Sequence, residues 1–123
     1  MKPYVEKIET EVMYAEKSWG TYTVLDIQPG SLTNKLSMKA GSHMSYHMHN
    51  HRDEVITVIS GKGRVVVDGI EQTLLPGNVI SISAGCKHTI EAISNIELIE
   101  VQLGEISDTD KIEFQSKSKI EGV

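Results

Sequence analysis

The stretch GSHMSYHMHNHRDEVITVISG, residues 41–61, places several histidines and acidic residues between two glycines. His47 and His49 are separated by a single residue, so their side chains point to the same face where the backbone is extended. Glu54 adds a carboxylate, and His88 is the candidate for a fourth ligand farther along the chain. Imidazole and carboxylate groups in this combination are typical of divalent metal sites. The stretch therefore predicts a metal centre on the face of a β-sheet.

Most of the remaining chain favours short β-strands. Apolar, β-branched and aromatic residues are concentrated in residues 21–27, 55–60, 64–67, 70–75, 79–82, 88–93 and 96–101. Asp68-Gly69 between two of these runs predicts a two-residue hairpin, and we expect further turns at residues 50–53 and around Ile112 and Phe114. No segment of helical length repeats its apolar residues with the helical period. The pattern predicts an all-β sandwich or barrel.

Composition restricts the classes of function. The length of 123 residues corresponds to one domain, and the net charge of −5 argues against a nucleic-acid partner. No apolar run approaches the roughly 20 residues that span a bilayer, so we expect no membrane segment. The N-terminus is polar, and the only cysteine, Cys86, cannot form an internal disulfide. These features predict a cytoplasmic protein.

Two spaced motifs, in residues 41–61 and 77–88, resemble the two motifs of the cupin family. The family usually has proline where Ser83 stands and asparagine where Ala92 stands, and neither is a ligand position. The resemblance implies a single cupin barrel, the double-stranded β-helix or jelly roll, built from two antiparallel sheets. We expect the barrel over residues 17–104, an N-terminal arm or swapped strand in residues 1–16, and a polar tail in residues 105–123.

The cupin resemblance also implies one divalent metal ion, held by His47, His49, Glu54 and His88. Zinc is the ion we expect most, and manganese, iron or nickel would suit the same ligands. Four protein ligands leave one or two coordination positions for water or substrate, as a catalytic site needs.

A closer resemblance is to the cupin domain of type II mannose-6-phosphate isomerases. It is carried by Trp19-Gly20 and by the stretches at residues 51–54, 85–88 and 98–104. The resemblance implies interconversion of mannose 6-phosphate and fructose 6-phosphate. The chain differs from those enzymes in four places: Ser18 replaces a proline, His47 replaces a glutamine, Val55-Ile56 replaces His-Trp, and Glu113 stands where an arginine for the phosphate is expected.

Three further residues are candidates for the reaction. We expect His51 or Lys87 to act as the catalytic base and Arg52 to bind the substrate phosphate. Each has an ordinary alternative. His51 could be a rim histidine, Lys87 a solvated turn lysine, and Arg52 a partner of Asp53.

Two other functions remain open from the sequence. A non-catalytic or regulatory metal-cupin would bind a sugar or another small polar ligand with the same fold. A metal-dependent dioxygenase would use the same ligand set for oxygen chemistry. In each case we expect a small-molecule ligand and a homodimer.

Overall fold

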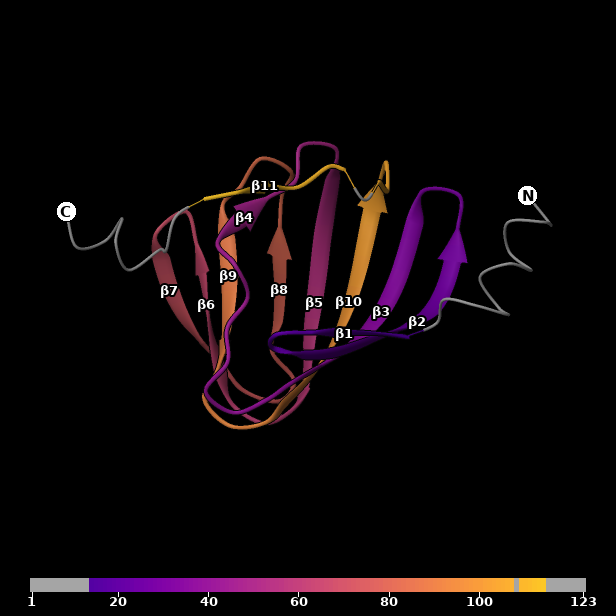
Figure 1. Ribbon diagram of the computed structural model, residues 1–123. Coiled ribbons are helices and arrows are strands. Elements are labelled where there is room, and N and C mark those ends of the chain that lie inside the picture. Colours follow the sequence, from indigo (N-terminus) through magenta and orange to yellow (C-terminus); the bar gives the residue numbers. More distant parts are fainter. Residues whose placement is uncertain (1–13, 108, 115–123) are drawn as a thin grey trace.

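The computed structural model describes residues 14–107 and 109–114, and the only regular elements among them are strands. They are β1 (Tyr14–Lys17), β2 (Gly20–Gln28), β3 (Ser31–Met38), β4 (His47–Met48), β5 (Arg52–Ser60), β6 (Gly63–Val67), β7 (Ile70–Leu74), β8 (Val79–Ile82), β9 (His88–Ala92), β10 (Ile96–Gly104) and β11 (Ile112–Glu113). One sheet has the order β1-β2-β3-β10-β5-β8 and the other β11-β4-β9-β6-β7, with antiparallel pairing (Figure 1). The expected all-β barrel of two antiparallel sheets is confirmed.

Every strand run expected from the sequence is present, and the Asp68-Gly69 hairpin is confirmed. Asp68 has φ of 49° and Gly69 has φ of 84°, the left-handed pair that a two-residue hairpin turn requires. The expected turn at residues 50–53 is shorter, because β5 already begins at Arg52. The turn expected around Ile112 is instead the two-residue strand β11. No helix that could cross a membrane occurs among the described residues.

The inner face of the larger sheet is divided into an apolar and a polar end. On β10, Ile96 and Leu98 are buried toward one end of the barrel, and Glu100 and Gln102 follow on the same face. Neighbouring strands repeat this division, because Leu36 lies opposite Leu98 and Asn34 lies opposite Glu100. The apolar end belongs to the main core cluster. The polar end is where a functional site can form.

Residues 109–114, expected to belong to a polar tail, fold back onto the barrel. β11 pairs with β4, as Figure 1 shows at the upper end of the barrel. The Asp110 carboxylate accepts hydrogen bonds from the backbone N–H groups of Asn50 and His51, each at 2.8 Å. The Phe114 N–H donates to the Tyr46 carbonyl at 2.8 Å. At the other end, β1 pairs with β2 of the same chain, and residues 1–13 of the expected arm lie outside the described residues.

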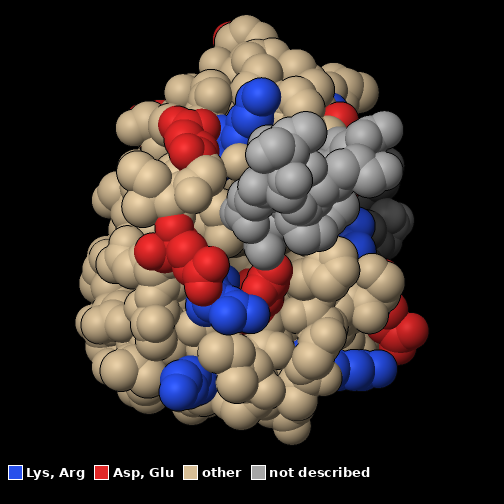
Figure 2. Space-filling model, turned by 90° about the vertical axis from the view of Figure 1, so that its left-hand side faces the viewer, with Lys and Arg blue, Asp and Glu red and all other residues tan. Residues whose placement is uncertain are grey.

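The outer surface carries interspersed charges. Arg64 on β6 pairs with Glu91 at 3.0 Å and with Glu71 at 3.3 Å. Figure 2, viewed from the side of β6 and β7, shows acidic and basic side chains next to one another. Arg64 is therefore engaged outside the barrel and does not contribute to its interior.

The turn at Gly61, between β5 and β6, provides a test of the fold. Its φ of 90° favours glycine, and a Cβ there would overlap the Asn95 carbonyl oxygen. We expect Gly61→Ala to lower the free energy of unfolding by about 3 kcal/mol or more. Gly69→Ala is the matched control, because Gly69 has φ of 84° but open space around it, so only a strain of roughly 1–2 kcal/mol is expected. Urea denaturation measures both, and equal losses would contradict the predicted overlap.

Candidate metal centre

Three histidines from two separate segments meet inside the barrel. His47 begins β4, His49 follows that strand directly, and His88 begins β9 opposite His47. The ring centroids are 5.0 Å apart for His47 and His49, 4.3 Å for His47 and His88, and 5.7 Å for His49 and His88. One nitrogen of each ring lies within 4.8 Å of the others, and all three side chains are buried. This spacing allows the three rings to share one ion.

Glu54 reaches the same point from the opposite sheet. It lies on the inner face of β5 and is buried. Its Oε1 is 3.3 Å from His88 Nε2, and its Oε2 is 3.5 Å from His49 Nδ1. The structure thus brings together the four residues that the sequence proposes as ligands, one from the larger sheet and three from the smaller sheet and its adjoining loop.

Hydrogen bonds to the backbone set the orientation of two of the rings. His47 Nδ1 donates to the Ser45 carbonyl at 2.7 Å, and His88 Nδ1 donates to the Cys86 carbonyl at 2.9 Å. Because a carbonyl oxygen can only accept, each Nδ1 carries a proton and Nε2 of the neutral ring keeps its lone pair. His88 Nε2 is buried and makes no hydrogen bond of acceptable geometry, although Glu54 Oε1 is near. Two acceptors that face each other in this way fit a cation between them.

The protonation states also suit a metal. Burial, with a smaller contribution from His88, lowers the pKa of His47 to about 4. Burial likewise lowers the pKa of His49 to about 4, against the opposing effect of Glu54. Burial alone would raise the pKa of Glu54, but His88, His49 and Arg52 lower it to about 2. At neutral pH His47 and His49 are therefore neutral and Glu54 is ionised, which are the forms that bind metals.

Arg52 lies against the ligands. Its Nη2 donates to His49 Nε2 at 2.8 Å and to Glu54 Oε2 at 3.4 Å, and its Nε is buried without a partner. It does not pair with Asp53, whose carboxylate accepts the Ala84 N–H at 2.8 Å. The Arg52 guanidinium therefore belongs to the interior of the barrel, where it can meet an anion.

The two residues proposed as bases lie elsewhere. The His51 side chain is 61% exposed, and its Nδ1 is 3.5 Å from Asp110. Lys87 Nζ is 4.5 Å from the centroid of the Phe114 ring. Neither side chain lines the cavity that is lined by His47, His49 and Glu54. The structure does not bring them to the metal centre.

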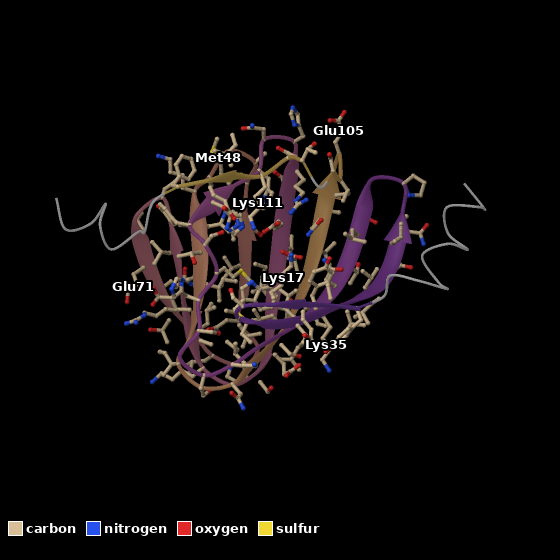
Figure 3. The ribbon with its side chains drawn as sticks, viewed as in Figure 1. Lys17, Lys35, Met48, Glu71, Glu105 and Lys111 are labelled. Carbon is tan, nitrogen blue, oxygen red and sulfur yellow. The ribbon has the colours of Figure 1, made fainter. Side chains whose placement is uncertain are left out.

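The cavity at the histidine cluster has a volume of about 590 Å³. Its charged lining residues, apart from the histidines, are Lys17, Arg52, Glu54, Glu100, Asp110 and Lys111. Figure 3 shows Lys17 and Lys111 between the two sheets, and Lys35 at the outer edge of the molecule. A second hollow of about 510 Å³, lined by residues 27–32 and 104–107, contains no histidine. Among the described residues, the group of histidines, cysteines and acidic side chains that could hold an ion is His47, His49 and His88, beside the first cavity.

Sequence reasoning missed several lining residues. The side chains of Glu100 and Gln102 lie on the same buried face of β10 as those of Ile96 and Leu98. The sequence could have indicated these two residues, because side chains of a strand alternate between its two faces and polar residues here stand at positions expected to face the core. Lys17 and Lys111 carry no such signal, since their positions depend on how β1 and the C-terminal segment pack onto the barrel.

Comparison with solved structures supports the fold. An RmlC-like cupin from Shewanella frigidimarina is 22% identical with a TM-score of 0.69, covering 76% of this chain and 85% of that chain. KdgF from a Halomonas species is 17% identical with a TM-score of 0.68, covering 80% of this chain and 84% of that chain. These likenesses show that the barrel is a cupin fold.

Comparison with curated sequences identifies the family. The mannose-1-phosphate guanylyltransferase ManC of Salmonella typhimurium is 30% identical over 127 aligned residues, covering 95% of this chain and 26% of the relative. A mannose-1-phosphate guanylyltransferase of Escherichia coli is 28% identical, covering 91% of this chain and 25% of the relative. The chain thus spans about a quarter of the length of these relatives. The family described as mannose-6-phosphate isomerase C-terminal matches residues 6–116, so the chain belongs to this family of cupin domains.

Proposed function

We propose that this chain is a metal-dependent sugar-phosphate isomerase that interconverts mannose 6-phosphate and fructose 6-phosphate. One observation carries the proposal: His47, His49 and Glu54, three members of the candidate metal site, line a cavity together with Lys17, Arg52 and Lys111. A metal centre and a group of cations are what an aldose–ketose reaction on a phosphorylated sugar needs. The family description and the mannose-phosphate names of the relatives support the same substrate class.

We assign His47, His49, Glu54 and His88 as the ligands of one divalent ion, with zinc expected and manganese, iron or nickel compatible. The bound ion would supply Lewis-acid polarisation of the sugar carbonyl and hydroxyl oxygens. The protein contributes the orientation of these ligands. The Ser45 and Cys86 carbonyls hold two of the rings, so that their Nε2 atoms are available.

Phosphate binding is assigned to the cavity cations. Glu113, at the position where an arginine was expected, is 58% exposed, and its carboxylate lies 3.2 Å from Lys111 Nζ and 3.1 Å from Ser45 Oγ. Lys111, two residues earlier, is the cation that this segment contributes to the cavity. Lys17 is a second one, and its ammonium lies 5.7 Å from the centroid of the Tyr22 ring. Lysines bind phosphate as point charges, so neither needs the fixed geometry of an arginine fork.

The contact between Glu113 and Lys111 also favours a second candidate function, a metal-cupin that binds a sugar without turning it over. A carboxylate 3.2 Å from the ammonium reduces the positive charge available to a phosphate. Arg52 is likewise engaged by His49 and Glu54. In this alternative the cavity would bind a sugar or another small polar ligand.

Metal binding can be tested with matched histidine variants. We expect the reconstituted protein to hold one ion per chain, because four ligand side chains converge on one point. His88→Ala removes a central ligand and should lower the affinity by more than the roughly 10–100-fold typical of losing a supporting group. His51→Ala should bind as the wild type does, because His51 lies outside the cavity. Elemental analysis and calorimetry measure both. Less than one ion in the wild type, or an equal loss in His51→Ala, would refute the assignment.

Isomerase activity can be tested on protein loaded with zinc, manganese, iron(II) or nickel in a coupled assay for fructose 6-phosphate. Lys111→Met should raise KM for mannose 6-phosphate roughly 10-fold, because one charge-assisted contact to the phosphate is lost. Lys35→Met is the control, since Lys35 pairs with Glu97 outside the cavity, and its kinetics should not change. Absence of turnover with every metal, together with calorimetric binding of the sugar phosphate, would favour the non-catalytic alternative.

A further inference from the structure

A trio of polar side chains occupies the inner face of the larger sheet beside the metal centre. Asn34 lies on β3, and Glu100 and Gln102 lie on β10. Their exposed fractions are 4%, 8% and 6%, and all three side chains line the cavity that contains the histidines. Asn34 Nδ2 donates to Glu100 Oε1 at 3.0 Å, and Gln102 Nε2 donates to the same oxygen at 2.9 Å. The trio thus holds the Glu100 carboxylate in one orientation.

Two atoms of this polar network have no hydrogen-bond partner. The other oxygens of the two amides, Asn34 Oδ1 and Gln102 Oε1, are buried without a hydrogen bond. Both amides donate to the same oxygen of Glu100, Oε1. A network that served only stability would be expected to satisfy its own members, since unpaired buried polar groups are costly. The free acceptors fit a ligand that brings hydroxyl groups.

The strand register places the trio next to the metal ligands. Gln102 lies directly opposite Glu54, and Glu100 lies opposite Ile56, one inward position farther along β5. Glu100 and Glu54 are therefore diagonal neighbours on one face, a relation that corresponds to roughly 7–8 Å. A small ligand in the cavity could contact both the metal centre and Glu100.

The environment of Glu100 differs from that of Glu54. Burial, followed by the charge of Glu54, raises the pKa of Glu100 to about 7, although hydrogen bonds from Asn34 and Gln102 act in the opposite direction. Arg52, also on β5, lowers the pKa to a smaller extent. Its buried position in the cavity, diagonal to a proposed metal ligand, places this carboxyl group where it can face a bound sugar.

The other carboxylates of the cavity are less suited to move a proton, and Lys17 and Lys111 are assigned to the substrate phosphate. Arg52 stays protonated in proteins, and the four proposed ligands are engaged by the ion. The Asp110 carboxylate is held by two backbone N–H groups, and these bonds lower its pKa. His51 and Lys87, the bases expected from the sequence, do not line the cavity. Glu100 is the remaining carboxylate among the described lining residues.

We propose that Glu100 is the catalytic residue that transfers the proton between C2 and C1 of the sugar, with Asn34 and Gln102 as its positioning residues. This inference rests on the isomerase function proposed above. The Glu100 carboxylate takes the proton from C2 of the open-chain aldose. The C–H electron pair forms the C1–C2 double bond, and the π pair of the C1 carbonyl moves to O1. The O2 hydroxyl proton passes to O1 as the carbonyl bond at C2 forms. The Glu100 carboxylic acid then returns its proton to C1, which gives the ketose without any oxidant or reductant.

The decisive variant is Glu100→Gln, which keeps the size of the side chain and removes its basicity. In D₂O, NMR follows the exchange of the C2 proton of mannose 6-phosphate on the metal-loaded protein. We expect exchange to fall roughly 100-fold or more, the usual contribution of a general base. Metal content and the Kd for mannose 6-phosphate should stay within about threefold of the wild type. Glu97→Gln, the same change on the outer side of β10, is the control and should exchange normally, because Glu97 pairs with Ser37 and Lys35.

Glu100→Ala allows a second measurement, chemical rescue, which would have no effect if Glu100 were only structural. It leaves space for formate, and added formate should restore exchange by supplying the missing carboxylate. If Glu100→Gln fails to fold, this variant still tests the catalytic role of Glu100. A folded, metal-loaded Glu100→Ala protein that formate does not rescue would overturn the proposal.

The remaining outcomes separate the two proposals. If the wild type isomerises the sugar and Glu100→Gln keeps its exchange rate, the role of Glu100 is overturned and the isomerase function stands. If Glu100→Gln loses metal or substrate binding together with exchange, Glu100 is structural and the catalytic role is overturned. If the wild type shows neither isomerisation nor exchange with any of the metals, the isomerase function fails and the role of Glu100 fails with it.

Discussion

The burial of a carboxylate among three histidines is the constraint on which the rest of this structure depends. Glu54 contacts His49 and His88 inside the barrel, where an unpaired charge would be strongly destabilising. The site is tolerated because the opposite end of the same sheet face is apolar, with side chains such as Leu98 and Val58 fully enclosed. The apolar end stabilises the barrel, and the polar end can then hold side chains in an arrangement that suits a ligand.

Two buried carboxylates on neighbouring strands receive different environments and therefore different roles. Glu54 lies among His88, His49 and Arg52, which lower its pKa and keep it ionised, as a metal ligand must be. Burial, followed by the negative charge of Glu54, raises the pKa of Glu100, against the hydrogen bonds from its two neighbouring amides. Carboxyl groups whose environments drive their pKa values apart are the usual basis for dividing ligand and proton-transfer roles in one site.

The C-terminal segment shows how a charge can be supplied from an unexpected position. The sequence has Glu113 where the resemblance suggested an arginine, which by itself argues against phosphate binding. Pairing of β11 with β4 brings Lys111 to the cavity, and β1 adds Lys17 from the other end of the described chain. Positive charge in the cavity is therefore contributed by segments that flank the barrel.

The sequence by itself determined seven of the eleven described strands, β2 and β5–β10, the Asp68-Gly69 hairpin and the His47 and His49 pair, and the cupin resemblance completed the set of four candidate ligands. These depend on local spacing, because the two-residue period of a strand places His47 and His49 on one face. The same reasoning could not place His51, since the chain bends after His49 and turns that side chain to the solvent. Only the tertiary structure decided that Arg52 meets the ligands and that Asn34 meets Glu100, 66 residues away in the sequence. Contacts of this kind depend on the register between distant strands, and no local pattern encodes that register.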